Sequence, residues 1–302
     1  MSDLSHIVKA YDVRGIVPDQ LNESVARALG TAFVEMLREA GDDADRIVIA
    51  HDMRDSGPGL AAAFAAGANS AGVAVVSIGL GSTDELYYAS GALNLAGAMF
   101  TASHNPARYN GIKLCRAGAR PVGQDSGLAV VRQRAEELLN DLGAVAEGPR
   151  LIEERDLLAD YAEHLRSLVD LSGIRPLKVV VDAGNGMGGY TVPAVLGEQV
   201  LPGLPLEIVP LYFELDGTFP NHEANPLEPA NLVDLQAAVR DHRAGSRPGA
   251  RSVPRGHGDP QPDYFGRGTG DHHRERRRPG AQPGRALVHQ GRDGPYECRV
   301  RG

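Results

Sequence analysis

Short apolar runs alternate with amphipathic segments along the first half of the chain. Four apolar runs lie at 7–10, 46–50, 73–76 and 97–100, and helical spacing of apolar positions occupies 22–41, 56–72, 84–95 and 127–142. Apolar runs of this length predict buried strands, and apolar positions three or four apart predict helices with one buried face. The alternation predicts βαβ units and therefore an α/β fold.

Polar residues and glycines mark where these helices begin and end. Asn22 and Ser56 stand at positions where a side-chain oxygen can cap a helix. Gly41 and Gly72 follow the first two helical patterns, as expected of helix C-termini. The residues expected to face inward from the helix over 127–142 are Val130, Ala135, Leu138 and Leu139.

A second set of elements follows a segment rich in Gly and Pro at 146–149. We expect helices over about 154–171 and 231–240, and strands at 177–182 and 208–213. A further helix is expected to open from the glycine-rich run at 184–189 and to continue through Leu196. The Gly and Pro residues predict a domain boundary. The predicted organisation is a first domain over 1–148, a second over 149–243, and a tail over 244–302.

Composition and charge narrow the class of protein. The chain has 302 residues, of which 42% are hydrophobic, so it can bury a full core. The net charge of -8 argues against a general nucleic-acid binder. Cys115 and Cys298 form neither a metal-ligand spacing nor a disulfide framework, which favours a reducing cytoplasm. No apolar run approaches the roughly 20 residues that a membrane-spanning helix needs, and no signal peptide is expected.

Candidate chemistry is concentrated at Thr101–Pro106 and Asn110–Lys113. Ser103 follows a predicted strand, at the carboxyl end where open α/β sheets place functional residues. A serine hydroxyl needs activation, and a neighbouring His104 with a cation such as Lys113 suits phosphoryl chemistry better than acyl chemistry. The alternative is that Ser103 and Asn105 only form hydrogen-bonded turns before Pro106.

The string Thr-Ala-Ser-His-Asn-Pro, followed by Asn-Gly-Ile-Lys, resembles the phosphoserine loop of the α-D-phosphohexomutase family, and especially its bacterial phosphomannomutase/phosphoglucomutase members. The resemblance implies that Ser103 carries the phosphoryl group. It places His104, Lys113 and Arg14 at that serine as catalytic residues. It also assigns phosphate or substrate binding to Asn105, Lys113 and Arg14.

Two further motifs extend the resemblance. Tyr11–Ile16 matches a Tyr-Asp-x-Arg-Gly-Ile loop, expected here after the first strand, which by resemblance brings Arg14 to the phosphoserine. An ordinary salt bridge is the alternative for this arginine. The segment His51–Ser56 is the third match, and we assign Arg54 a supporting role there, with a helix-capping turn as the alternative.

A glycine motif supports a different class of function. Gly184, Gly186 and Gly189 form Gly-x-Gly-x-x-Gly after a predicted strand, and Glu214 ends the next strand. This is the pattern of a dinucleotide-binding loop and predicts an oxidoreductase. The same Asp-Ala-Gly-Asn-Gly run also resembles the second domain of the phosphohexomutases, where tight backbone packing would explain the glycines.

The family resemblance implies an isomerase that transfers phosphate reversibly between C6 and C1 of mannose or glucose phosphates. The reaction would proceed through a phosphoserine and a hexose 1,6-bisphosphate, which also serves as activator. The implied fold is α/β/α layers with mixed sheets, with two domains retained of four. The implied partners are small sugar phosphates.

The family's Mg²⁺ would be held by the phosphate of Ser103 and by three carboxylates of an Asp-Gly-Asp-x-Asp-Arg loop. That loop is missing after residue 243. Because Mg²⁺ offsets phosphate charge during transfer, we expect weak or no mutase turnover from this chain. A mutase fragment with no catalytic role is therefore the alternative.

The composition changes abruptly in the tail. Residues 244–302 contain 12 Arg and no Lys against 6 acidic residues, a net charge of +6, whereas residues 1–243 hold 19 basic and 33 acidic residues, a net charge of -14. A disordered Arg/Gly-rich arm that binds RNA or acidic partners is one interpretation, and a solvated tail is another. A third is translation out of frame, because a one-nucleotide shift over 261–265 and 270–290 permits strings that resemble the family's third domain.

Overall fold

The structure is a computed structural model, and it describes residues 2–141 and 151–245. The predicted boundary at 146–149 and almost all of the predicted tail lie outside these described residues. Among the described residues, no helix is both long enough and apolar enough to cross a membrane.

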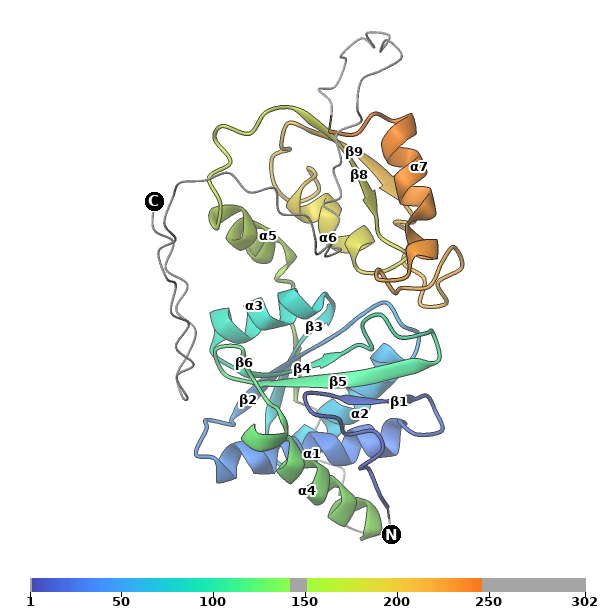
Figure 1. Cartoon of the computed structure of the whole chain (residues 1–302). Coiled ribbons are helices and arrows are strands. Elements are labelled where there is room, and N and C mark those ends of the chain that lie inside the picture. Colours follow the sequence, from blue (N-terminus) through green and yellow to red (C-terminus); the bar gives the residue numbers. More distant parts are fainter. Residues whose placement is uncertain (1, 142–150, 246–302) are drawn as a thin grey trace, which may run out of the picture. The chain divides into compact units, whose positions relative to one another are not determined.

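The first set of elements is built on a seven-stranded mixed sheet (Figure 1). Its strands, in sheet order, are β1 (Val13–Ile16), β5 (Tyr109–Arg116), β4 (Ala96–Phe100), β2 (Arg46–His51), β3 (Ala74–Leu80) and β7 (Ile152–Glu154), and β6 (Arg120–Pro121) pairs with β5. Strand β5 is antiparallel to both β1 and β4, while β4, β2, β3 and β7 are mutually parallel. The predicted α/β fold with mixed sheets is confirmed.

Helices cover both faces of this sheet. They are α1 (Glu23–Glu39), α2 (Gly57–Ser70), α3 (Thr83–Leu93) and α4 (Leu128–Asn140), and a short 3-10 turn, η1 (Gln124–Ser126), precedes α4. Figure 1 shows α1, α2 and α4 on one side and α3 on the other. Alternate residues of the central strands pack on opposite faces of the sheet. Ile47 and Ile49 belong to the core on the side of α1 and α2, whereas Val48 packs with Leu86 of α3 on the other side. This double coverage explains why β4 is buried at every residue.

Local sequence signals set several helix ends. The side chain of Asn22 accepts a hydrogen bond from the Val25 N–H, which confirms the predicted cap of α1. Ser82 and Glu85 form a reciprocal capping box at the start of α3. The helix expected after Ser56 is present, but the Ser56 side chain does not cap it. That hydroxyl accepts a hydrogen bond from Asn110 instead.

The first predicted strand was wrong in position. Residues 7–10 contribute only an isolated bridge between Val8 and Val13, and the strand itself is Val13–Ile16. Arg14 therefore lies on a strand and not in a loop. The physical reason is the partner: Tyr109–Arg116 forms a strand that sequence periodicity did not predict, and its ladder with Val13–Ile16 fixes the register.

The phase of α4 also differs from prediction at one position. Val131 is fully buried, whereas Val130 is exposed. Leu128, Val131 and Ala135 lie on the face that meets the core, at helical spacing. Leu138 and Leu139 pack against that core as expected.

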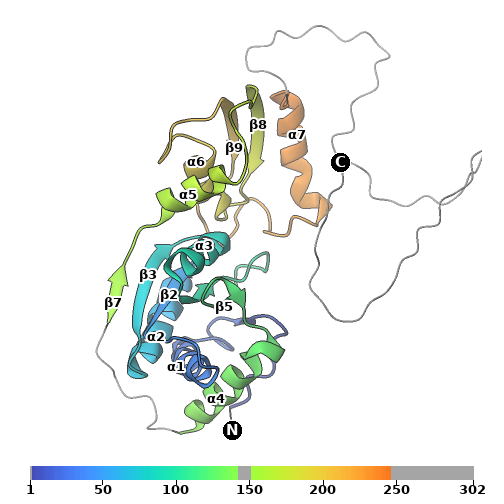
Figure 2. The same ribbon diagram turned by 90° about the vertical axis from the view of Figure 1, so that its left-hand side faces the viewer.

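The second set of elements is smaller. It contains α5 (Leu158–Ser167), β8 (Leu177–Asp182), α6 (Gly188–Val195), β9 (Leu206–Leu211), a short 3-10 turn η2 (Pro229–Leu232) and α7 (Val233–Asp241). Strands β8 and β9 form a parallel pair, and α7 packs along β8 (Figure 2). The helix predicted from 154 begins only at Leu158, because residues 152–154 extend the first sheet beside β3.

Candidate active site

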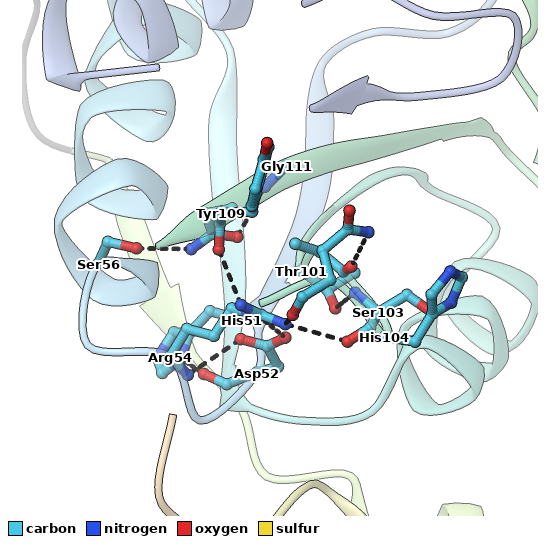
Figure 3. Close-up of polar contacts among 12 residues, drawn as sticks. His51, Asp52, Arg54, Ser56, Thr101, Ser103, His104, Tyr109 and Gly111 are labelled. Carbon is cyan, nitrogen blue, oxygen red and sulfur yellow. Dashed lines mark hydrogen bonds and ion pairs between the residues drawn. The ribbon is translucent and has the colours of Figure 1, made fainter. Parts of the chain in front are cut away.

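Strands β2 and β4 bring two of the sequence motifs together. They are parallel neighbours with His51 opposite Phe100, so the segments that follow them leave the sheet at the same edge. The Asp52 N–H continues the ladder by donating to the Phe100 carbonyl at 2.9 Å. The carboxyl ends of adjacent parallel strands are where open α/β sheets hold ligands. The motif at 51–56 and the loop that carries Ser103 therefore form one structural unit (Figure 3).

Ser103 sits in this loop with an unusual backbone conformation. Its φ is +53°, in the left-handed region that non-glycine residues rarely occupy. The Ser103 N–H donates to the Thr101 hydroxyl at 3.1 Å, and the Asn105 side chain donates to the Ala102 carbonyl at 2.8 Å. The loop thus contains the predicted turn contacts, yet the Ser103 side chain is left exposed.

Among the residues that the structure describes, the Ser103 hydroxyl has one close polar neighbour. Its Oγ lies 3.3 Å from Nδ1 of His104, and both residues are exposed (Figure 3). An imidazole nitrogen at this distance can exchange a proton with the hydroxyl. The structure therefore brings these two predicted residues together in an arrangement suited to activating an oxygen nucleophile.

Arg54 holds the same loop from inside the protein. Only 2% of this residue is exposed, and its guanidinium lies within the loop that carries Ser103. Nη2 donates to the carbonyls of Ser103 and Asn105 at 3.0 and 2.7 Å, and Nη1 donates to those of Pro106 and Tyr109 at 3.0 and 2.8 Å. The sequence suggested only a supporting role for Arg54. Its position shortly after a buried strand was the feature of the sequence that could have indicated a larger structural role.

Asp52 balances the buried guanidinium. Its carboxylate lies 3.5 Å from Nε of Arg54 and accepts a hydrogen bond from the Arg54 N–H at 3.0 Å. Burial raises the pKa of Asp52, against the opposing effects of Thr101 and Arg54. Burial likewise lowers the pKa of Arg54, although a guanidinium stays protonated in proteins. Neither charge is free to bind a ligand.

Arg14 and Lys113 meet at a residue that sequence reasoning missed. Oδ2 of Asp12 accepts hydrogen bonds from Nη2 of Arg14 and, at 3.1 Å, from Nζ of Lys113. The Asp12 side chain is 11% exposed, and the two cations are each 26% exposed. These contacts join the predicted cations to each other through Asp12, and they do not join them to Ser103 or His104. The available signal was that Asp12 belongs to the same motif as Arg14.

Gly111 allows the strands behind the loop to approach closely. A Cβ at this position would lie 2.3 Å from the Val13 carbonyl oxygen and 2.8 Å from that of Thr101. Real side chains do not tolerate such contacts with backbone atoms. The glycine in Asn-Gly-Ile-Lys is thus required where β1, β5 and the residue after β4 converge.

Ser103 and His104 line a pocket of about 540 Å³. Asp52 and Thr101 line it too, together with residues of the later elements that include Asp182 and His222. A volume of this size is within the range of small-molecule sites. Arg14 and Lys113 are not among the lining residues.

Protein atoms lie close to two glycines of the Gly184–Gly189 loop. A Cβ at Gly189 would lie 2.0 Å from the Phe213 carbonyl oxygen, and one at Gly184 would lie 3.0 Å from the His222 ring. Gly184 also has a φ of +51°. These contacts favour close backbone packing as the reason for the glycines, rather than dinucleotide binding.

His222 is fixed by acceptors at both ring nitrogens. Nε2 lies 3.2 Å from both carboxylate oxygens of Asp182, and Nδ1 lies 2.9 Å from the Glu223 carbonyl. Burial by itself lowers the pKa of His222, but the hydrogen bond to Glu223 and the pairing with Asp182 leave it raised. Both ring nitrogens can donate to these acceptors only in the imidazolium form, and the contacts tie the segment that carries His222 to the end of β8.

The described residues do not fit a magnesium site. Within residues 2–141 and 151–245, no group of three or more His, Cys, Asp or Glu side chains is arranged to hold a metal ion. In the pocket, the carboxylate of Asp52 is engaged by Arg54, and that of Asp182 by His222. Mg²⁺ requires several oxygen ligands in octahedral geometry, and these engaged carboxylates do not supply them.

A mixed sheet with helices on both faces, and an exposed serine loop at its carboxyl edge, define a layered α/β protein of the kind that handles small ligands at strand ends. Comparison with protein-family models gives two matches. Residues 5–140 match the phosphoglucomutase/phosphomannomutase α/β/α domain I, and residues 159–247 match domain II. The chain belongs to the phosphoglucomutase/phosphomannomutase family.

Individual relatives agree with this assignment. The chain is 43% identical over 237 residues to a protein named phosphohexose mutases from Xanthomonas campestris, covering 78% of this chain and 50% of that one. It is 38% identical over 239 residues to a phosphomannomutase of Escherichia coli, covering 78% and 51%. The chain thus spans about half the length of the curated relatives it matches.

A solved structure agrees as well. The crystal structure of a phosphoglucomutase/phosphomannomutase family protein from Burkholderia thailandensis superimposes with a TM-score of 0.69 at 34% identity, covering 80% of this chain and 52% of that one. Both family domains are thus represented in one chain, and the loop with Ser103 falls in the first of them.

Proposed function

We propose that this chain carries the phosphoserine of a phosphohexomutase, and that Ser103 accepts and returns the phosphoryl group of a hexose phosphate. The observation that supports this most is the loop itself. The exposed Oγ of Ser103 lies 3.3 Å from His104 at the carboxyl edge of the sheet, inside a pocket of about 540 Å³. The family membership gives this arrangement its chemical context.

The proposed reaction is reversible transfer of phosphate between C6 and C1 of mannose or glucose phosphate. Ser103 takes a phosphoryl group from a hexose 1,6-bisphosphate: its Oγ–P bond forms and the sugar O–P bond breaks. The hydroxyl proton passes to Nδ1 of His104 and from there to the released sugar oxygen, which leaves as a hydroxyl. The reverse step returns the phosphoryl group to the other sugar oxygen. The bisphosphate is therefore both intermediate and activator.

Arg14 and Lys113 are proposed to offset phosphate charge. One Asp12 carboxylate between two cations leaves an excess of one positive charge in the cluster. Such an excess favours a dianionic group nearby. Asn105 is proposed to bind phosphate or substrate at the loop, although its amide nitrogen donates to Ala102.

Magnesium is expected from the family, and when bound it would offset phosphate charge during transfer. The described residues supply no ligand set for it. Steady interconversion of hexose phosphates is therefore proposed to be weak in this chain, and phosphoryl capture by Ser103 is the step best suited to a direct test. The reaction is proposed to take place in the cytoplasm on small sugar phosphates.

The test is phosphoryl incorporation. The purified chain is incubated with glucose 1,6-bisphosphate or mannose 1,6-bisphosphate, with and without Mg²⁺, and the phosphorylated residue is located by mass spectrometry. We expect one phosphoryl group on Ser103, none in Ser103→Ala, and normal incorporation in Ser5→Ala, which changes another exposed serine. Wild-type protein that stays unmodified under all these conditions supports the alternative of a mutase fragment without a catalytic role.

A further inference from the structure

Arg54 connects both ends of the loop that carries Ser103. The segment from Thr101 to Arg108 links β4 to β5. This single guanidinium donates to three of its carbonyl oxygens and to that of Tyr109, the first residue of β5 (Figure 3). The acceptors belong to residues at the start, the middle and the end of the loop. One side chain therefore fixes the whole segment. Its hydrogen bonds offset the loss of backbone entropy that accompanies ordering of the loop.

The chemistry of the guanidinium suits this task. Its planar fork presents N–H groups in fixed directions, whereas a lysine ammonium is a single tetrahedral centre with three donors. Burying a charge is costly unless hydrogen bonds and an opposite charge compensate it. Here the carbonyls and Asp52 supply both, with Nε of Arg54 at 3.5 Å from the Asp52 carboxylate. Both terminal nitrogens of Arg54 donate to loop carbonyls, and Nε, which makes no hydrogen bond, is buried beside Asp52, so the guanidinium is not available to a phosphate.

The contact with Ser103 has a specific consequence. Ser103 has a φ of +53°, a conformation that is unfavourable for a non-glycine residue. The carbonyl of the same residue accepts from Nη2 of Arg54 at 3.0 Å. This bond fixes the orientation of the peptide group that follows Ser103. The strained conformation is thereby held, and with it the outward direction of the hydroxyl.

We propose that Arg54 is a positioning residue for phosphoryl transfer at Ser103. It acts through the loop backbone, by holding Ser103 in the left-handed conformation that presents Oγ beside His104, and it does not touch the phosphoryl group. The inference deepens the proposed function and rests on it for its catalytic part. Its structural part, the ordering of the loop by Arg54, stands on the hydrogen bonds alone.

The test compares Arg54→Lys with Arg46→Lys. Arg46 lies on the strand that leads to Arg54, and its side chain makes an exposed ion pair with Glu153, so it is a matched control. Hydrogen exchange measures loop order through the amide of Asn105, which donates to the Ala102 carbonyl at 3.1 Å. We expect this amide to exchange at least about tenfold faster in Arg54→Lys and at the wild-type rate in Arg46→Lys.

The second readout separates positioning from binding. The rate of phosphoryl incorporation at Ser103 from glucose 1,6-bisphosphate should fall at least about tenfold in Arg54→Lys at saturating bisphosphate, with half-saturation changed less than about threefold. A variant that is merely less stable but still folded would keep the wild-type rate. Circular dichroism and thermal unfolding report how much of each variant is folded.

The two hypotheses fail in different ways. Wild-type protein that takes up no phosphoryl group contradicts the proposed function, while the exchange measurement still tests the loop. Unchanged exchange and unchanged incorporation in folded Arg54→Lys overturn the inference. If Arg54→Lys does not fold, hydrogen exchange of the wild-type chain provides the test. An Asn105 amide that exchanges as fast as an unprotected amide overturns the inference, and a protected Asn105 amide supports it.

Discussion

The ammonium nitrogen of Lys113 lies 3.1 Å from Oδ2 of Asp12, the same oxygen that accepts a hydrogen bond from Arg14. Lys113 belongs to β5 and Arg14 to β1, and the register pairs Arg14 with Gly111. One largely buried carboxylate therefore sets the positions of two cations that lie on adjacent strands but are far apart in the sequence. This relationship was not visible in the spacing of the residues along the chain.

Replacing Asp12 by Asn should disturb both cations. Asn keeps the size of the side chain but removes the charge, so Lys113 and Arg14 lose their common partner and repel each other. We expect the free energy of unfolding to fall by about 1–3 kcal/mol, as measured by urea denaturation. Asp55→Asn, at an exposed position, is the control and should change it by less than about 0.5 kcal/mol. Equal effects of the two substitutions would contradict a special role for Asp12.

Two glycine-to-alanine substitutions should have opposite effects. At Gly111 the new Cβ would lie 2.3 Å from the Val13 carbonyl oxygen, so the strands must separate, and we expect a loss of about 3 kcal/mol. At Gly91, within α3, no atom lies within 4 Å of the new Cβ, and alanine should stabilise the helix by about 0.5–1 kcal/mol. Thermal unfolding distinguishes the two, and a Gly111→Ala protein as stable as wild type would show that the convergence at this glycine is not tight.

Glu85 should make stability depend on pH. Burial raises the pKa of this carboxyl to about 7, with Asp156 adding to the effect and a hydrogen bond from the Ser82 N–H opposing it. The folded state therefore holds the proton more tightly than the unfolded chain, whose carboxyl has a pKa of 4.5. The contribution is fully present below pH 4.5 and is lost as pH rises through 7. A shift of this size corresponds to about 3 kcal/mol.

Glu85→Gln tests this dependence. Glutamine can keep the hydrogen bond to the Ser82 N–H, so the capping box survives while the titration is removed. We expect the variant to match the wild type near pH 4.5 and to exceed it by about 2–3 kcal/mol at pH 8, as measured by urea denaturation across that range. A constant difference between the two proteins at all pH values would contradict the raised pKa.

The pair of His222 and Asp182 should give a second dependence on pH. The pKa of His222 is raised in the folded state, so its contribution is fully present below the usual histidine value of 6.5 and is lost as pH rises through the folded value. Asp182→Asn removes the charge but keeps an oxygen that can accept from the Gly184 N–H. We expect the variant to be less stable than wild type by about 1 kcal/mol at pH 6, with a smaller difference at pH 9. A difference that grows with pH would exclude the imidazolium.

The sequence alone determined those helices and strands whose apolar pattern and capping residues all lie within one short segment of the chain. The apolar run at 97–100 was identified as a strand because both faces of β4 are covered, and α1 was identified with its cap because Asn22 bonds only three residues away. The serine loop was found in the same way, since its candidate groups, Ser103 and His104, are adjacent in the chain.

The tertiary structure decided whatever depends on a partner distant in the chain. Strand β1 was misplaced because its register is set by β5, whose polar and apolar residues show no clear period, and residues 152–154 join a sheet whose other strands lie far upstream. Arg54 is separated from its most distant acceptor, Tyr109, by 55 positions, and Asp12 from Lys113 by 101. Local patterns report the burial of one segment, whereas these contacts exist only once sheet registers bring segments together.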